Sequence, residues 1–167
     1  AQGPQAPLRV RPGACHGARG FVDCVDDLRD LLGQPKVHPE KKLEVDTVGV
    51  STGMYYTPVG GDIMRIECSV MEGKDGLVLT GQLGDVMKES VEIAASFIRH
   101  HHTRFDVDLE VFKKEDLHVH FPAGAVPKDG PSAGVTITTA LISLLSGSKG
   151  MRPTGKVAMT GEMTLSG

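Results

Sequence analysis

The chain has 167 residues, of which 40% are hydrophobic and 23% charged, and its formal net charge is −3. A chain of this length can bury a core of its own, and its composition is ordinary for a globular protein. The small negative charge, without a long basic run, argues against a dedicated nucleic-acid-binding surface. The longest apolar stretch, around residues 140–145, is too short to cross a bilayer.

The three cysteines and the first residues say little about function. Cys15, Cys24 and Cys68 form neither a CxxC pair nor a disulfide framework, which favours a reducing compartment. Residues 1–22 are rich in Gly, Pro and Ala and lack the apolar segment of a secretory signal. We interpret them as a disordered or non-native lead-in, with a transit peptide as the alternative.

Residues 23–47 are predicted to connect this lead-in to an ordered domain. The apolar residues between Val25 and Leu32 share one stripe, which predicts a short helix that ends at Gly33. The stretch that follows contains prolines and alternating charges, as linkers do. The ordered domain is therefore predicted over residues 48–167.

Three strands come first in that domain. The runs 48–54, 62–70 and 76–81 are rich in Val, Ile and Leu, and segments with turn chemistry separate them. The apolar residues of the second run do not alternate cleanly, which leaves a bulge or burial on both faces open.

A helix, a strand and a second helix are predicted next. Residues 83–102 carry apolar side chains at steps of three and four, which is a helical period with one buried face. Residues 116–121 alternate as a strand, and residues 132–146 are apolar or small nearly all round, as expected of a central helix. Residues 156–167 are predicted to form two short strands around Gly161–Glu162. This order predicts an α/β (α+β) domain, a sheet with helices packed on it.

Ser132 is the strongest candidate for a functional residue. It follows Gly130 and Pro131, which suit a tight turn and the first position of a helix, and small residues come after it. The amides and dipole of a helix that starts here favour a developing anion, either an oxyanion or a phosphate. The simplest alternative is that Ser132 only caps the helix. The chain has no GxxxxGK[ST] motif, so a Walker-type phosphate loop is not present.

Local sequence leaves the roles of two further residues, Asp129 and Thr160, open. Asp129 precedes the serine by three residues, so it either orients a neighbouring charge or caps the helix. Thr160 lies at a strand end before a turn and by itself indicates nothing.

Two groups of histidines do not predict a metal site. His118 and His120 share one face of a predicted strand, but no third ligand with a defined spacing accompanies them. We interpret them as a polar strand face near a solvent-accessible cleft. His100, His101 and His102 are consecutive on a predicted helix and point about 100° apart, so they cannot converge on one ion. They are expected at the solvated end of that helix.

Five sequence blocks in order resemble the proteolytic domain of the Lon family of ATP-dependent proteases. These blocks are TPVGGDI, GQLGDVMKES, HVHFPAGAVPKDG, PKDGPSAGVTITTALISLLSG and VAMTGEMTLSG. The resemblance runs from about Asp27 to the end of the chain, and the ordered set of blocks makes it specific. VDDLRDLLGQPK is similar to the family's connector from the ATPase module, which assigns residues 23–47 to that connector. The resemblance implies the family's mixed sheet with packed helices, incomplete at the C-terminus.

The resemblance also implies a serine endopeptidase with a Ser-Lys dyad. Ser132 matches the nucleophile, and amides at the start of its helix would stabilise the oxyanion. The base is a lysine that burial keeps neutral. Thr160 matches the residue whose hydroxyl orients this lysine, and Asp129 matches an acidic residue that organises the turn before the serine. On this interpretation His118 and His120 are idle in proton transfer.

The family's lysine lies in a block after TLSG that resembles LPxGGxKEK, and the chain has no such block. Lys128, Lys149 and Lys156 match no catalytic position, and the segment around the last two is slightly longer than is usual in the family. We therefore expect a C-terminally truncated proteolytic domain that carries the nucleophile without the base and has negligible peptidase activity alone.

Further expectations concern the parent protein. The resemblance implies a hexamer that degrades unfolded, damaged or regulatory proteins, with ATP and Mg²⁺ bound in an ATPase module outside this segment. Within the segment we expect no cofactor, metal, nucleic-acid or membrane site. The compartment would be the cytoplasm in a bacterium, and the mitochondrial matrix or peroxisome in a eukaryote. Two alternatives stay open, a phosphate binder related to small-molecule kinases and a non-catalytic assembly module in which Ser132 is only a cap.

Overall fold

The computed structural model describes residues 33, 45–57, 60–122, 127–146, 152–153 and 155–167. Apart from Gly33, these residues belong to the unit formed by Pro39–Gly167. The lead-in predicted over residues 1–22 and nearly all of the predicted connector lie outside the described residues.

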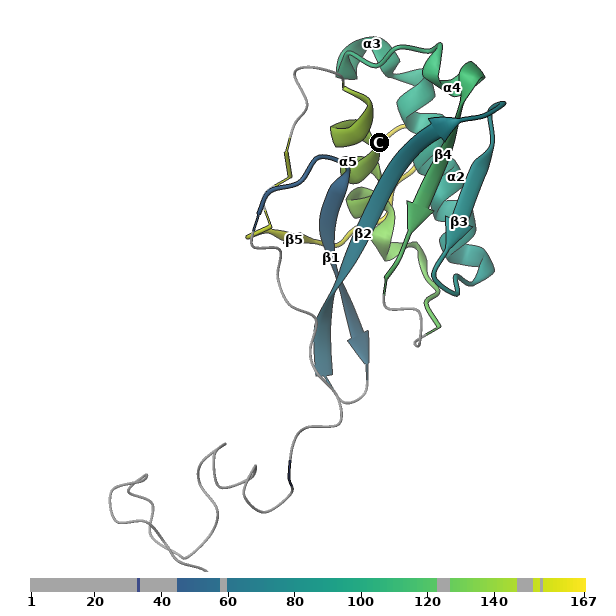
Figure 1. Ribbon diagram of the computed structural model, residues 1–167. Helices are drawn as coiled ribbons and strands as arrows, with labels where there is room; N and C mark the ends of the chain where they lie inside the picture. The colour runs from purple at the N-terminus through teal and green to yellow at the C-terminus, as the bar shows by residue number, and fades with distance from the viewer. Residues whose placement is uncertain (1–32, 34–44, 58–59, 123–126, 147–151, 154) are drawn as a thin grey trace, which may run out of the picture. The chain divides into compact units, whose positions relative to one another are not determined.

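One mixed sheet of five strands, in the order β3-β4-β2-β1-β5, forms the centre of the fold (Figure 1). The strands are β1 (Val50–Thr57), β2 (Gly60–Glu72), β3 (Leu77–Thr80), β4 (Glu115–His120) and β5 (Ala158–Met159). β1 pairs antiparallel with β2, and β2 with β4, whereas β3 runs parallel to β4 and β5 parallel to β1. The three strands predicted before the first helix are therefore confirmed, and so is the predicted class of fold.

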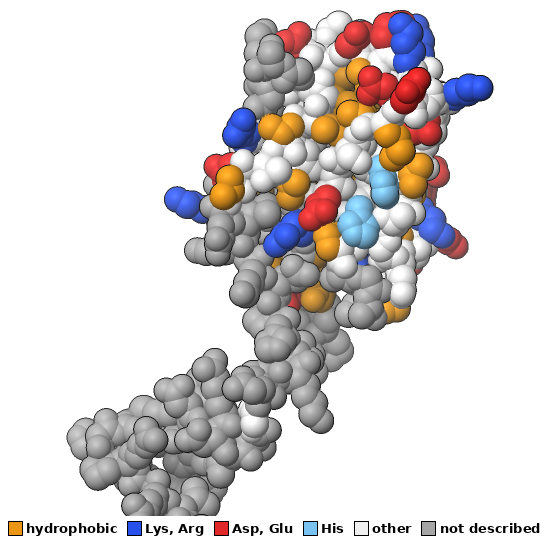
Figure 2. Space-filling model, viewed as in Figure 1, with side chains coloured by type: hydrophobic (Ala, Val, Ile, Leu, Met, Phe, Trp, Pro, Cys, Tyr) orange, Lys and Arg blue, Asp and Glu red, His pale blue; other side chains and the backbone are white. Residues whose placement is uncertain are grey.

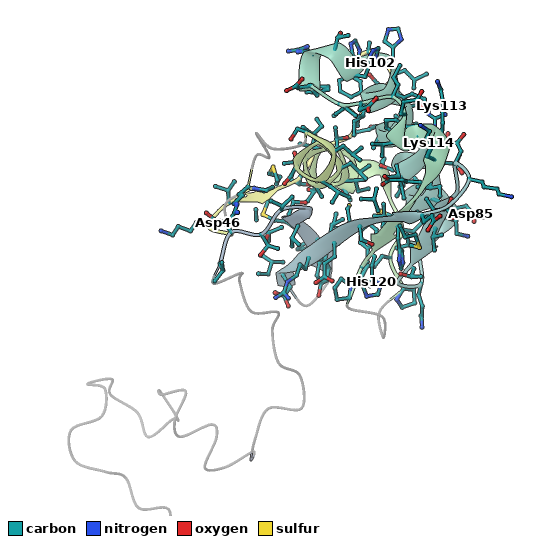
Figure 3. All side chains as sticks on the ribbon, turned by 45° about the horizontal axis from the view of Figure 1, so that its top comes forward. Asp46, Asp85, His102, Lys113, Lys114 and His120 are labelled. Carbon is teal, nitrogen blue, oxygen red and sulfur yellow. The ribbon has the colours of Figure 1, made fainter. Side chains whose placement is uncertain are left out.

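The helices pack on one face of this sheet. They are α2 (Asp85–His100), α3 (His102–Phe105), α4 (Val111–Lys114), the 3-10 turn η1 (Pro131–Ala133) and α5 (Gly134–Leu145). α2 packs against α5, and α5 packs against β1 and β2. In Figure 3 α5 is seen nearly end on, on the opposite side of the sheet from the labelled His120.

Along β2, successive side chains lie on opposite faces of the sheet, and only one face is buried. Met64, Ile66 and Cys68 are buried and alternate with less buried residues. The register with β1 is continuous along the hairpin, so the bulge left open by the sequence does not occur. Burial also raises the pKa of the Cys68 thiol to about 12, because the thiolate would lose its hydration.

The core lies between the sheet and the two long helices. Its fully buried members come from β2, α2, β4 with the residue after it, and α5, and they include Ile66, Val91, Ala94, Ile98, Val119, Phe121, Ile137, Ala140 and Leu141. The apolar face predicted for residues 83–102 and the nearly all-round burial predicted for residues 132–146 are both confirmed. The burial of apolar surface in such a core is the main favourable contribution to the free energy of folding.

The long helix predicted from residue 83 starts later in the structure. α2 begins at Asp85, because Leu83 forms a parallel bridge with Lys128 and the Gly84 N–H donates to the Lys128 carbonyl at 2.7 Å. These contacts hold the backbone extended just before the helix.

The second of the two strands predicted over residues 156–167 was wrong. β5 ends at Met159, and no strand follows Gly161–Glu162 in the described residues. The chain turns instead, since Thr164 Oγ1 accepts the Ser166 N–H at 3.3 Å and the Thr164 carbonyl accepts the Gly167 N–H at 3.2 Å. The hydroxyl of a threonine competes for backbone donors in this way and favours a turn over a strand. No helix in the described part of the chain is both long and apolar enough to cross a membrane.

Candidate active site

Ser132 is an exposed residue in η1, the short turn directly before α5. Gly130 before it has a φ of 127°, a conformation that a residue with a Cβ rarely adopts. Pro131 occupies the start of the turn, where a missing N–H costs no hydrogen bond. Neither η1 nor α5 has a side-chain cap, so the Ser132 hydroxyl does not act as the N-cap of either. The geometry leaves this hydroxyl at the surface beside the start of a buried helix.

The first amides of this helix fall into two groups. The Gly134 N–H closes the 3-10 turn, and the Val135 N–H donates to the Gly161 carbonyl at 3.0 Å. The amides of Ser132 and Ala133 belong to the 3-10 turn that opens the helix. These two donors lie at the positive end of the helix dipole, next to the serine hydroxyl.

Asp129 caps a different helix from the one that follows Ser132. Its Oδ1 accepts the Met87 N–H in the first turn of α2 at 3.0 Å, and also accepts the Gly130 N–H at 3.0 Å. Gly84 lies against this carboxylate so closely that a Cβ there would collide with it. The alternative that Asp129 caps the helix after Ser132 was therefore wrong, since the helix that it caps is α2.

The segment before Ser132 is tied by further contacts to α2 and to the residues just before that helix. The Lys128 N–H donates to the Gln82 carbonyl at 3.1 Å, and the buried Lys128 side chain donates from Nζ to the Gly81 carbonyl at 3.4 Å. The buried Ser90 hydroxyl of α2 donates to the Pro131 carbonyl at 3.5 Å, a weak bond at that length. α2 therefore fixes one side of the turn that carries Ser132.

Thr160 and Gly161 hold the other side of this turn. The Gly161 N–H donates to the Ser132 carbonyl at 2.7 Å, and Thr160 Oγ1 donates to the same carbonyl at 3.3 Å. A Cβ on Gly161 would come within 2.9 Å of the Val135 side chain, so a larger residue there would have to displace that side chain. The structure thus brings Thr160 to Ser132, although they are 28 residues apart.

The histidine pair of β4 lies away from this site. His118 and His120 are on the face of the sheet opposite the helices, and both rings hydrogen-bond to Thr80 Oγ1. Figure 2 shows histidine side chains together on this face. Among the described residues, no group of three or more His, Cys, Asp and Glu side chains could hold a metal ion. His100 ends α2 as expected, whereas His102 begins α3.

Some residues of the site were not found from the sequence. Ser90 lies on the buried face of α2, and its position between the apolar residues of the helical period was a signal that could have been used. Met163 packs its backbone against Gly134, where a Cβ would come within 2.6 Å of the Met163 nitrogen. No local pattern reports such a contact, because Met163 follows β5 and Gly134 begins α5.

An exposed serine at the start of a buried helix, on an α/β sheet, is a placement that serine hydrolases use for a nucleophile. A family model described as the Lon protease C-terminal proteolytic domain matches residues 24–167. The chain belongs to this family, and the resemblance seen in the sequence is confirmed.

Curated relatives agree with this assignment. Lon protease 1 of Sorangium cellulosum is 54% identical over 98% of this chain, which corresponds to 20% of that protein. Lon protease 2 of Thermus thermophilus is 55% identical over 84% of the chain and 17% of its own length. A Lon protease of Desulfovibrio desulfuricans is 46% identical over the full chain and 17% of its own length. The chain thus spans a fifth or less of the length of these relatives.

Proposed function

We propose that the chain forms part of an ATP-dependent serine endopeptidase in which Ser132 is the nucleophile. The observation that carries the proposal is the Ser132 hydroxyl itself, exposed and without a capping role at the N-terminal end of a buried helix. The amides of Ser132 and Ala133, at the start of the turn and helix, would be the donors to an oxyanion. The family match supports a protease, whereas a phosphate binder and a non-catalytic module have no comparable support.

The proposed chemistry follows from the hydroxyl and these amides. A neutral lysine amine takes the proton of Ser132 Oγ, and the oxygen attacks the scissile carbonyl to form a tetrahedral intermediate. The oxyanion accepts from the two amides. The lysine then gives its proton to the leaving amine, and water hydrolyses the acyl-enzyme with the lysine as base again.

The base in this scheme is a lysine that is not among residues 1–167. Lys128, four positions before the serine, is bonded to the Gly81 carbonyl, and Lys156 is exposed. Thr160 would orient the catalytic lysine: donation of its hydroxyl proton to the Ser132 carbonyl leaves its oxygen lone pairs as acceptors for an amine. Asp129 would act as a support that fixes the turn to α2, without taking part in proton transfer.

The proposal extends to the parent protein. It would be a hexamer that degrades unfolded, damaged or regulatory proteins, and ATP with Mg²⁺ would bind in an ATPase module outside these residues. We propose no nucleic-acid or membrane partner for this segment. If the source is a bacterium, as it is for the relatives named above, the protein would be cytoplasmic, and otherwise it would be in the mitochondrial matrix or the peroxisome.

Ser132→Ala tests the proposal in a protein that contains this chain, the ATPase module and the lysine. We expect cleavage of an unstructured substrate such as casein to fall to background, because the nucleophilic oxygen is removed. Serine-directed covalent labelling should be lost in parallel. Ser96→Ala, at an exposed position of α2, is the matched control and should leave cleavage unchanged.

Persistent casein cleavage by the Ser132→Ala protein would show that another residue is the nucleophile. The 167-residue chain without further segments is expected to cleave casein negligibly, since it lacks the base. Substantial serine-dependent cleavage by that chain would contradict the assignment of the base to a lysine outside it.

A further inference from the structure

α5 contains a fully buried threonine, Thr136, whose hydroxyl bonds to a residue outside the helix. Thr136 Oγ1 donates to the Met159 carbonyl of β5 at 3.0 Å, and the Thr136 carbonyl accepts the Ser51 hydroxyl of β1 at 2.8 Å. Gly53 lies opposite Met159 in the parallel pairing of β1 with β5. A Cβ on Gly53 would lie 3.4 Å from Thr136 Oγ1, at van der Waals contact, so β1 passes directly beside this hydroxyl.

The other threonines of α5 do something different. Thr138 Oγ1 donates to the Gly134 carbonyl and Thr139 Oγ1 to the Val135 carbonyl, each at 2.8 Å and four residues back along the helix. Such bonds are local and are the usual way in which a helix accommodates a threonine. Thr139 Oγ1 also lies 3.8 Å from Met159 Sδ, a weak contact with the side chain of that residue and not with its backbone. The Thr136 hydroxyl instead joins the helix to a strand, 23 residues further along the chain.

This bond anchors a strand that has few other bonds. β5 consists of Ala158 and Met159 only, and it pairs with β1 over these two residues. The next two residues, Thr160 and Gly161, are those that donate to the Ser132 carbonyl. The Thr136 hydroxyl therefore fixes the backbone one residue before the contacts that hold Ser132.

We propose that Thr136 is a positioning residue for Ser132, which rests on the proposed function of that serine. The buried hydroxyl fixes the position of β5 relative to α5. β5 in turn places Thr160 and Gly161 where they donate to the Ser132 carbonyl. Without the hydroxyl, the Met159 carbonyl loses a donor and the short strand can shift. A displacement of a catalytic group by about 1 Å can cost up to about 100-fold in rate.

The first test is kinetic and uses a protein with the ATPase module and the catalytic lysine. Thr136→Val replaces the hydroxyl by a methyl group of similar size. We expect kcat to fall about 10-fold with KM changed less than about 2-fold, as for a loss confined to the chemical step. Thr136→Ser should restore most of kcat. The matched control is Thr138→Val, which removes a buried hydroxyl with a local bond and should leave kcat unchanged.

A second pair of variants separates positioning from folding. Thr136→Ser and Thr136→Ala differ by one oxygen at the same site, and the serine variant should be about 10-fold faster per folded molecule. In the 167-residue chain, the Gly161 amide that donates to Ser132 should exchange faster with solvent in Thr136→Ala than in Thr136→Ser. A general loss of stability would instead speed exchange at core amides as well.

Equal kcat values for the serine and alanine variants, or a Thr136→Val protein with the wild-type kcat, would overturn the role of Thr136. The same conclusion follows if Thr138→Val loses as much kcat as Thr136→Val. Failure of the proposed function is distinct from this, because it appears as activity that survives Ser132→Ala. If Ser132→Ala is inactive and the variants of Thr136 are normal, only the positioning role is wrong.

Discussion

At the scale of single residues, the Ser132 turn depends on one carboxylate that serves two backbone segments. Asp129 accepts from Met87, 42 residues before it, and from Gly130 beside it. A carboxylate at the N-terminus of a helix satisfies an amide that has no partner within the helix and also interacts favourably with its dipole. Asp129 thus links the stability of α2 to the shape of the turn.

Asp129→Ala should lower the free energy of unfolding of the chain by about 1 kcal/mol, the usual cost of losing an N-cap. Urea denaturation followed by circular dichroism measures this change. Asp85→Ala is the matched control, since Asp85 is also in the first turn of α2 but its side chain is 98% exposed. Its loss should cost about 0.5 kcal/mol or less. Equal effects of the two substitutions would show that Asp129 acts only through its charge.

The residue scale also shows what the sequence could predict of the site. Ser132 was identified from its own neighbours, because a turn before an apolar helix is a local pattern. The roles of Asp129 and Thr160 needed partners 42 and 28 residues away, and no local pattern reports those. Thr136 was hidden for the same reason, since a threonine within an apolar helix looks like an ordinary core residue.

At the scale of elements, α5 and the segment after β5 approach each other at a glycine. Gly134 has helical dihedral angles, φ −53° and ψ −47°, which alanine also adopts. A Cβ there would meet the Met163 nitrogen at 2.6 Å and its Cβ at 2.9 Å, closer than atoms without a bond can lie. The glycine is therefore explained by this contact, and its backbone angles do not require it.

Gly134→Ala distinguishes helix propensity from the contact with Met163, because the two change the stability in opposite directions. Helix propensity alone would stabilise the chain by about 1 kcal/mol, whereas overpacking costs about 1–3 kcal/mol. We expect a net loss of stability in thermal unfolding. The control is the same substitution in a chain shortened at Glu162, which removes Met163 and should turn the loss into a gain. Stabilisation in the unshortened chain would contradict the contact.

Elements were predicted well where one face is buried and poorly where packing is distant. The period of two in β4 and the helical period of α2 follow from burial on one face, which the sequence records directly. The start of α2 depends on a bridge to Lys128, and the end of β5 depends on a turn at Thr164 and on contact with α5. Contacts of this kind leave no periodic pattern in the sequence, so they could not be predicted from it.

At the scale of the whole molecule, the helices cover only part of the sheet. α2 and α5 lie on one face, and the β1–β2 hairpin continues beyond them (Figure 1). Along β2 the buried residues are confined to the stretch from Met64 to Cys68, and the hairpin end is half-buried or exposed, with Tyr56 on β1 82% exposed. Stability should therefore be graded along one continuous strand.

Amide hydrogen exchange measures this gradient at two amides of β2. The Cys68 N–H donates to the Gly49 carbonyl at 2.8 Å, and Cys68 belongs to the core. The Ile63 N–H lies near the hairpin end and donates to the Asp62 side chain at 2.8 Å. We expect the Cys68 amide to exchange only on global unfolding, and the Ile63 amide to exchange through local opening. The Ile63 amide should therefore be the faster by several orders of magnitude.

Leu141→Ala tests which opening each amide reports. Leu141 is fully buried in α5, and its truncation should cost about 2–5 kcal/mol of global stability. Because each 1.4 kcal/mol is a factor of ten, exchange at Cys68 should accelerate about 30-fold or more. Exchange at Ile63 should stay nearly constant, since the hairpin end opens without the core. Equal acceleration at both amides would mean that the hairpin and the core unfold as one unit, and that the helices stabilise the whole sheet rather than the part they cover.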